Sequence, residues 1–277
     1  MSRLVISVVI PCYNGARHLH EALASVRAQL RQPLEVILVD DGSTDNSVDI
    51  AEAYGARVVT QANRGEGAAR NAGIRAASGQ LVASLDADDR WRPHHLSTVA
   101  ALLDEEPTAV GAFGAVQRFG SKTNLIPGYV RPGAPVLVLE EAFNDWLHTT
   151  ISSVVRRDAL LSIGGFDEKE RSAVDFDLWL RLAASHRFVA THEVTADWRM
   201  HAEQQSAKPW VQLAAVYRFR RRFLENLHAV GDSRAQGLER DFNSIWKRDC
   251  RRSYSQRDYL TLRALLRAAP VVEPWRR

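Results

Sequence analysis

The sequence predicts an α/β protein with a mostly parallel central sheet and helices on both of its faces. Nearly continuous apolar runs recur along the first half of the chain, and helical patterns of apolar residues lie between them. Runs of this kind that alternate with helices favour parallel pairing. The 277 residues, 45% of them hydrophobic and 25% charged, are typical of a soluble globular protein with one main core and an appendage.

Four strands are predicted, at residues 4–10, 34–39, 57–60 and 81–85. The first two are continuous β-branched runs and the third is weaker. The predicted helices span residues 16–28, 47–54, 66–77 and 93–103. In open parallel sheets, ligands bind beyond the carboxyl ends of the strands. The segments that follow the four strands are residues 11–14, 40–45, 61–70 and 86–89, and we expect the site there.

The fourth strand ends abruptly in Asp86, Ala87, Asp88 and Asp89. Three carboxylates at a strand end, with no cation in the sequence until Arg90, are unfavourable unless a cation or a ligand is expected there. This strand end therefore predicts a metal site that receives an anionic substrate.

Two further strand ends carry polar groups. Asp40 and Asp41 are adjacent carboxylates, which repel each other unless one accepts hydrogen bonds from a ligand. In the same turn, Asp45 or Thr44 is available as a helix N-cap, and for Asp45 we favour this structural role.

The segment Gly65-Glu66-Gly67-Ala68-Ala69-Arg70 lacks the third glycine of a dinucleotide fingerprint. A glycine-rich helix entry that lets Arg70 and Asn71 reach the ligand is the better interpretation. Arg70 could equally be a surface cation.

Cysteine content and charge limit the function classes. Cys12 and Cys250 cannot form a disulfide framework or a metal knuckle, so a reducing, cytoplasmic setting is expected. The sequence contains no apolar run of the roughly 18 residues that a membrane span needs, and the chain begins with a strand pattern, so we expect neither a span nor a secretion signal. The net charge of +3 divides into −6 for residues 1–207 and +9 for residues 208–277.

The basic tail has apolar residues at helical spacing between Trp210 and Leu227, with Arg218 and Arg220 to Arg222 between them. One interpretation is a helix docked on the main core with a solvated basic face. The other is attachment to an anionic membrane surface, which the arginines at 248, 251, 252 and 257 also favour. Nucleic acid is not expected, because no reading helix or stacking motif accompanies the charge.

Several segments carry a family resemblance. In order they are Val9-Ile10-Pro11-Cys12-Tyr13-Asn14, Val39-Asp40-Asp41-Gly42-Ser43-Thr44-Asp45, Arg70-Asn71-Ala72-Gly73 and Asp86-Ala87-Asp88-Asp89. Together they resemble the family 2 glycosyltransferases, which have the GT-A fold. Farther along, residues 164–168 and 174–182 resemble the family's G-G-F-D-E and E-D-x-D-L-W-L-R-L elements, with Val174 where a glutamate is common. Residues 198–206 resemble its Y-R-x-H-x-x-x-Q-S ending, including Gln205 and Ser206.

The resemblance implies a metal-dependent, inverting transfer of a sugar from a nucleotide donor. The residues it implies for nucleotide-sugar binding are Pro11, Tyr13, Asn14, Asp41, Arg70, Asp86, Ala87 and Arg199. Asp88 and His201 would bind Mn²⁺ or Mg²⁺, and Asp89 could substitute as a ligand. Asp175, at the start of a predicted helix, would be the general base, because inverting transfer needs one carboxylate to take the proton of the acceptor hydroxyl. Asp177 is the reserve candidate.

The resemblance also implies a domain division and partners. Residues 1–207 would form the GT-A catalytic domain, with a nucleotide-binding half (1–110) and an acceptor-binding half (111–207), and residues 208–277 would be a basic helical extension. The expected donor is a UDP-sugar, and the expected acceptor is a saccharide or a lipid-linked saccharide. Donor and acceptor are chosen by loop shape, here around residues 118–135 and 146–153, rather than by motif.

Two other function classes compete with this one. A sugar nucleotidyltransferase should carry a glycine-rich, lysine-bearing loop after the first strand, and residues 11–14 offer none. An inactive nucleotide- or glycan-binding module would tolerate loss of the base. The joint presence of Asp86, Asp88, Asp175 and His201 argues against such a module.

Overall fold

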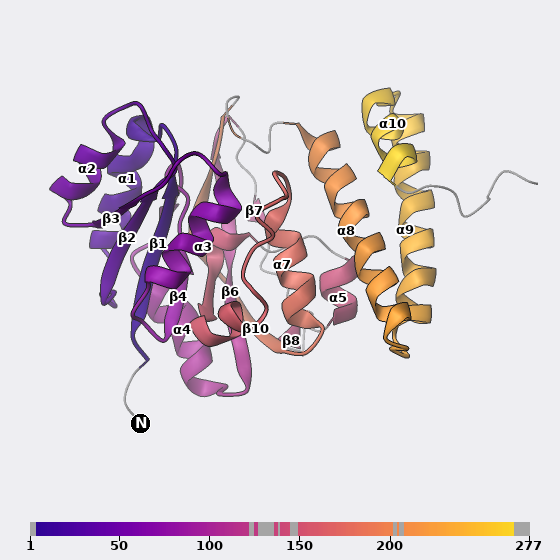
Figure 1. The fold of residues 1–277 in the computed structure, drawn as a ribbon, viewed down its shortest axis with the longest axis horizontal. Coiled ribbons are helices and arrows are strands. Elements are labelled where there is room, and N and C mark those ends of the chain that lie inside the picture. Colours follow the sequence, from indigo (N-terminus) through magenta and orange to yellow (C-terminus); the bar gives the residue numbers. More distant parts are fainter. Residues whose placement is uncertain are drawn as a thin grey trace, which may run out of the picture. The chain divides into compact units, whose positions relative to one another are not determined.

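The computed structural model describes residues 4–121, 125–126, 136–137, 139–144, 149–201, 204 and 208–268 (Figure 1). The chain divides into two compact units. The first contains residues 1–138 and 147–201, and the second contains residues 139–146 and 202–277. Among the described residues, no helix combines the length and the apolar character that crossing a bilayer requires.

The first unit is built on a mixed sheet with strand order β3-β2-β1-β4-β9-β6-β10-β5. The strands on this path are β1 (Ile6–Cys12), β2 (Glu35–Asp40), β3 (Arg57–Thr60), β4 (Leu81–Ser84), β5 (Arg90–Trp91), β6 (Ala109–Gly120), β9 (Ser153–Arg156) and β10 (Arg187–Met200). The strands β3, β2, β1 and β4 pair in parallel, as do β6 and β10, whereas β9 runs antiparallel to both of its neighbours. Two short strands, β7 (Leu125–Ile126) and β8 (Val136–Leu137), pair with β6 and β10.

Helices cover both faces of this sheet, as the sequence predicts. They are α1 (Ala16–Arg27), α2 (Ser47–Ala53), α3 (Glu66–Ala76), α4 (His95–Glu105), α6 (Arg157–Ser162) and α7 (Val174–Ala183), with a 3₁₀ turn η1 (Thr150–Ser152). Val8 and Ile10 share a core with Leu19 of α1 and Leu96 of α4. On the opposite face, Val9 packs against α3 at Gly73, where a Cβ atom would lie 2.2 Å from Cγ1 of Val9. Gly73 therefore allows α3 to lie close to the sheet.

The strand register brings the predicted ligand segments to one edge of the sheet. Cys12 pairs with Asp40, and Asp40 pairs with Thr60, so β1, β2 and β3 end side by side. Two backbone hydrogen bonds continue this edge, from Asp41 N to the Cys12 carbonyl (2.8 Å) and from Gln61 N to the Asp40 carbonyl (2.9 Å). Parallel pairing is the cause, because it places the carboxyl ends of all these strands together.

The second unit is helical. It consists of α5 (Leu139–Asn144), α8 (Pro209–Ala229), α9 (Ala235–Ser255) and α10 (Tyr259–Ala268). The ring of Tyr217 packs on Phe242, with 5.7 Å between the centroids, and the Trp246 indole donates to the Leu265 carbonyl (3.3 Å). Arg220, which the sequence placed on a solvated basic face, is buried and donates to the Phe143 carbonyl (2.7 Å). Much of the apolar stripe of α8 is therefore buried, and Arg220 does not belong to the exposed charge.

Candidate functional site

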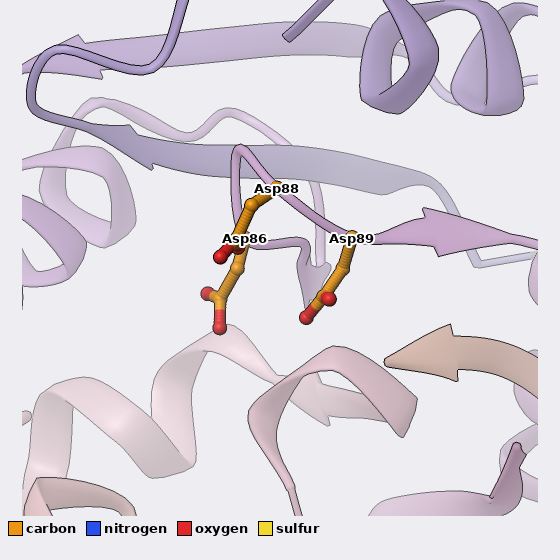
Figure 2. Close-up of side chains that lie close together, drawn as sticks. All are labelled: Asp86, Asp88 and Asp89. Carbon is orange, nitrogen blue, oxygen red and sulfur yellow. The ribbon is translucent and has the colours of Figure 1, made fainter. Parts of the chain in front are cut away.

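The acidic strand end forms a tight turn. A hydrogen bond from Asp89 N to the Asp86 carbonyl (3.1 Å) closes the turn, and β5 then pairs with β10. Figure 2 shows the three carboxylates of the turn, in which one ligand oxygen each from Asp86, Asp88 and Asp89 lies within 4.8 Å of the others. Asp89 is only 1% exposed, whereas the side chains of Asp86 and Asp88 are about one-third exposed. The turn thus presents two partly exposed carboxylates beside a buried one.

The end of β10 lies against this turn and brings Arg199 and His201 to it. His201 Nε2 lies 2.8 Å from Oδ2 of Asp88. The backbone N–H of Arg199 donates to Oδ1 of Asp89 (2.6 Å), and its Nε donates to the Asp88 carbonyl (2.7 Å). The same guanidinium pairs with Glu21 of α1 and lies 4.4 Å from the ring centroid of Phe119. Arg199 therefore fixes the shape of the acidic turn, and its contact with the nucleotide sugar stays a prediction.

Two carboxylates of the turn, Asp86 and Asp89, have raised pKa values. Burial raises the pKa of Asp89 well above its usual value, and the charges of Asp88 and Asp86 raise it further. Burial also raises the pKa of Asp86 to about 7, with Glu66 and Asp88 adding to the rise and Arg70 opposing it. A bound cation would relieve this excess of negative charge.

The residues of the turn suit a hard divalent ion. Oδ2 of Asp89 is buried in the acidic turn and has no hydrogen-bond partner within the described residues. Carboxylate oxygens are the ligands that Mg²⁺ and Mn²⁺ prefer, and the imidazole of His201 is also compatible with a transition metal. Asp88, Asp89 and His201 therefore fit a divalent metal.

A cation reaches the acidic turn from a helix that is distant in sequence. Arg70 of α3 is 1% exposed, and its Nη2 donates to Oδ1 of Asp86 (2.5 Å) and to Oγ1 of Thr150 (3.1 Å). Its Nη1 contacts the carboxylate of Glu66. In the sequence, no cation stands between the fourth strand and Arg90. In the folded chain, however, Arg70 contacts Asp86. Of the two interpretations of Arg70, the surface cation is wrong.

Asn71, by contrast, holds a loop. Its Nδ2 donates to the Phe166 carbonyl (2.9 Å) and to Glu168 (3.0 Å), and its Oδ1 accepts from Phe166 N (2.8 Å). Gly165 has φ +70°, and a Cβ atom there would lie 2.2 Å from Oδ1 of Asn71. The glycine pair of residues 164–165 thus allows the loop to approach α3.

The predicted nucleotide segment after β1 lies beside the turn after β2. Asn14, with φ 52°, donates its N–H to Oγ of Ser43 (2.9 Å), and its Oδ1 accepts from Thr44 N (2.8 Å). Tyr13 is 56% exposed, Pro11 belongs to β1, and Ala87 packs against the core. The exposed ring of Tyr13 is therefore available to a planar ligand.

The two aspartates at the end of β2, Asp40 and Asp41, are both buried. Asp41 accepts three hydrogen bonds from the loop between β3 and α3, from Gln61 Nε2 (2.7 Å), Arg64 N (2.8 Å) and Gly65 N (2.7 Å). Asp40 accepts from Ser43 N (3.0 Å). Asp45 accepts from Ser47 N and Ala16 N, while the N-cap position of α2 is Asn46, whose side chain makes no capping bond. Neither Asp45 nor Thr44 is the N-cap residue.

We expect Asp41→Ala to destabilise the protein by about 2–4 kcal/mol, because it leaves three donors of one loop without their acceptor. Urea unfolding of the full chain measures this change. The exposed Glu52→Ala on α2 is the matched control, with an expected change within about 0.5 kcal/mol. A loss of less than about 1 kcal/mol in Asp41→Ala would show that water replaces the carboxylate.

Asp175 lies in the first turn of α7, after Ala173, which has a left-handed φ of 52°. Its Oδ1 accepts from Phe176 N (2.9 Å). Burial raises the pKa of Asp175 to about 6, with the Glu66 carboxylate adding to the rise and Arg70 opposing it. The reserve candidate Asp177 is 5% exposed and pairs with Arg181 (2.8 Å), which also donates to the Gly165 carbonyl. Asp177 is thus part of the packing, whereas Asp175 is suited to proton transfer.

Three residues of this neighbourhood had no individually predicted role, and these are Glu21, Glu66 and Thr150. Glu66 had a visible signal, because it stands four residues before Arg70 on a predicted helix. Glu21 and Thr150 had none, since their partners Arg199 and Arg70 are distant in sequence. Gln205 and Ser206 lie outside the described residues.

Comparison with known sequences identifies similar proteins. The family model described as glycosyl transferase family 2 matches residues 7–164. An uncharacterized glycosyltransferase of Nostoc is 48% identical over 104 residues, which are 35% of this chain and 32% of that protein. An uncharacterized glycosyltransferase of Rickettsia prowazekii is 30% identical over 212 residues, which are 72% of this chain and 65% of that protein. The chain thus spans less than two-thirds of the length of these relatives.

Solved structures share the fold. TarS of S. aureus in complex with UDP-GlcNAc has a TM-score of 0.74 at 20% identity, with 96% of this chain and 82% of that chain covered. The mannosyltransferase PcManGT of Pyrobaculum calidifontis, in complex with GDP-Man and Mn²⁺, has a TM-score of 0.63 at 19% identity, with 99% and 88% covered. The fold is therefore the GT-A fold that the resemblance implies.

Proposed function

The chain belongs to glycosyl transferase family 2, and on this basis we propose that it transfers a sugar from a nucleoside-diphosphate donor to a hydroxyl of a saccharide or lipid-linked saccharide in cell-surface polysaccharide synthesis. The observation that carries the proposal is the acidic turn of residues 86–89. In this turn, Asp88 contacts His201 and Asp86 is bound by Arg70. A nucleoside-diphosphate sugar is the kind of anionic substrate that a cation held there would bind.

We propose a UDP-sugar as donor. The TarS structures with UDP and UDP-GlcNAc support this choice, while the structure of PcManGT with GDP-Man makes guanine the competing base. Tyr13 and the loop that Asp41 holds would contact the base and the ribose, together with Pro11 and Asn14. Asp86 and Ala87 would face the ribose. With three hydrogen bonds accepted, the Asp41 carboxylate retains acceptor capacity for one further donor.

A divalent ion, Mn²⁺ or Mg²⁺, would be held by Asp88 and His201, with Asp89 beneath them, and when bound it would stabilise the charge that grows on the departing diphosphate. The protein supplies the rest of the site. Arg199 fixes the turn, and Arg70 holds Asp86 in place. These contacts preorganise the carboxylates before the donor arrives.

Asp175 would act as the general base. The acceptor oxygen forms a bond to the anomeric carbon of the donor while the bond from that carbon to the diphosphate oxygen breaks, so the configuration inverts. The proton of the acceptor hydroxyl passes to the Asp175 carboxylate, and the nucleoside diphosphate leaves. A carboxyl with a pKa near 6 suits this transfer at neutral pH, because it is ionised yet still basic.

Binding of the donor tests the proposal most simply. We expect a UDP-sugar to raise the thermal unfolding midpoint of the full chain in the presence of Mn²⁺, and to do so less without the metal. GDP- and dTDP-sugars are the comparison. If no nucleotide sugar shifts the midpoint with Mn²⁺, the proposed donor site is wrong.

We also propose that the protein acts in the cytoplasm and that its basic helices contact the inner face of the membrane. On α10, Tyr259, Leu260 and Leu266 are 48–61% exposed, and Arg263 and Arg267 lie on the same side of the helix. The residues of α10 include no acid. Arginine among exposed aromatic and aliphatic side chains suits an anionic lipid surface.

Sedimentation with lipid vesicles checks this contact. We expect the full chain to bind phosphatidylglycerol vesicles and not phosphatidylcholine vesicles. Reversing the charges in Arg263→Glu/Arg267→Glu should weaken binding about tenfold or more, since each arginine near the surface contributes about 1 kcal/mol. Equal binding of the variant and the wild type would contradict the proposed surface.

A further inference from the structure

Glu21 links two arginines that border the acidic turn. It belongs to α1, and its side chain is 41% exposed. Its Oε1 accepts from Nη1 of Arg90 (2.6 Å), and its Oε2 pairs with Nη2 of Arg199. Arg90 directly follows Asp89 in the chain, whereas Arg199 reaches the turn from the end of β10. One carboxylate therefore joins the chain that leaves the turn to the strand that packs against it.

The guanidiniums of Arg90 and Arg199 lie over one aromatic ring. Their Cζ atoms are 4.3 Å and 4.4 Å from the centroid of Phe119. Arg90 also donates to Oδ2 of Asp197 (3.0 Å). Within the described residues, however, the guanidinium of Arg199 forms an ion pair with Glu21 alone. Because the two cations repel each other, the carboxylate of Glu21 that both contact stabilises their arrangement on the ring.

Arg199 connects Glu21 to the acidic turn. Its Nε donates to the Asp88 carbonyl (2.7 Å), and its backbone N–H donates to Oδ1 of Asp89 (2.6 Å). Without Glu21, the guanidinium would lose its carboxylate partner while it stayed beside the turn. It would then be free to pair with the carboxylates of the turn, and an arginine paired with them competes with a cation for the same oxygens.

We propose that Glu21 is a positioning residue of the acidic turn: its carboxylate holds the Arg199 guanidinium on the Asp88 carbonyl and away from the carboxylates that would bind the metal. The inference rests on the proposed function, since it concerns the metal site of the same reaction. An ion pair as exposed as that of Glu21 contributes little to stability. The loss of Glu21 should therefore change metal affinity more than it changes folding.

The test measures the affinity of the full chain for Mn²⁺, from the electron paramagnetic resonance signal of the free ion. The binding that Asp88→Ala abolishes is the binding at the turn. We expect Glu21→Gln to raise the dissociation constant of that site about three- to tenfold, less than the roughly ten- to hundredfold typical of groups that contact the metal ligands directly. Its thermal unfolding midpoint should stay within about 3 °C of the wild type. Glu225→Gln, which breaks an exposed pair with Arg221 on α8, should leave the affinity unchanged.

A second background separates positioning from the plain loss of a charge. In Arg199→Met, which has no guanidinium to hold, adding Glu21→Gln should change the dissociation constant less than about twofold, because both substitutions remove the same interaction. An equal loss of affinity in both backgrounds would show that Glu21 acts only as a nearby negative charge, and it would overturn the inference, as would an unchanged affinity in Glu21→Gln. Glu21→Ala carries the same expectations if Glu21→Gln does not fold. A failure of the proposed function would look different, because the wild type would then bind no more Mn²⁺ than Asp88→Ala.

Discussion

Asp88→Ala should lower the transfer rate at least about 10³-fold, because a metal that stabilises a leaving diphosphate contributes several kcal/mol to the transition state. Asp88 is the exposed carboxylate of the acidic turn that contacts His201, so its loss removes the proposed ligand pair. The measurement is initial-rate release of nucleoside diphosphate at saturating Mn²⁺. Asp49→Ala, an exposed aspartate on α2, is the matched control and should keep full activity.

Metal removal is the second arm of the same prediction. The wild type should lose activity in EDTA and regain it on addition of Mn²⁺, whereas Asp88→Ala should respond to neither. His201→Ala should require more Mn²⁺ and lose about ten- to a hundredfold in rate, since the carboxylates of Asp88 and Asp89 remain. Full activity of Asp88→Ala would contradict the assignment of the acidic turn.

Asp175→Asn should lower kcat by about 10²–10⁴-fold while donor binding stays unchanged, because an amide cannot take the acceptor's proton. In the wild type, the raised pKa of Asp175, about 6, predicts an acid limb of kcat/KM. Below that pH the carboxyl is protonated and the rate falls about tenfold per pH unit; above it the rate levels off. Asp175→Asn should lack this limb.

The stability of the protein tests the role of Asp175 independently of its activity. A folded-state pKa raised by burial means that ionised Asp175 costs stability above its unfolded pKa. At pH 7, Asp175→Asn should therefore raise the unfolding midpoint while it lowers activity. Asp177→Asn should do the reverse: it breaks the buried pair with Arg181, so stability falls and the pH profile keeps its acid limb. More than one-tenth of wild-type kcat in Asp175→Asn would contradict its role as base.

Within the first 105 residues, the four predicted strands and four predicted helices begin and end within two residues of their predicted limits, whereas the short strand β5 was not predicted. Local signals suffice here, because each β-branched run ends at a polar turn and each helix follows with its own apolar spacing. The meeting of residues 11–14, 40–45 and 86–89 also follows, since parallel pairing aligns strand ends.

The second half of the site depends on pairing that no local pattern encodes. β10 runs for 14 residues and meets both β6 and β5, and this pairing places Arg199 and His201 at the acidic turn. Only their resemblance to a family motif predicted that these two residues belong to the site. Arg70 is a similar case, because its spacing from Glu66 is local whereas its contact with Asp86 spans the sheet edge.

The proposed function requires that the acidic turn binds a metal and a nucleotide sugar for transfer. The most direct test is release of nucleoside diphosphate from UDP-, GDP- and dTDP-sugars by the full chain, with an acceptor mixture, in Mn²⁺ and in EDTA. We expect release from at least one donor, with the UDP-sugars first, in Mn²⁺ and not in EDTA. No release from any donor in Mn²⁺, or equal release in EDTA, would contradict the claim.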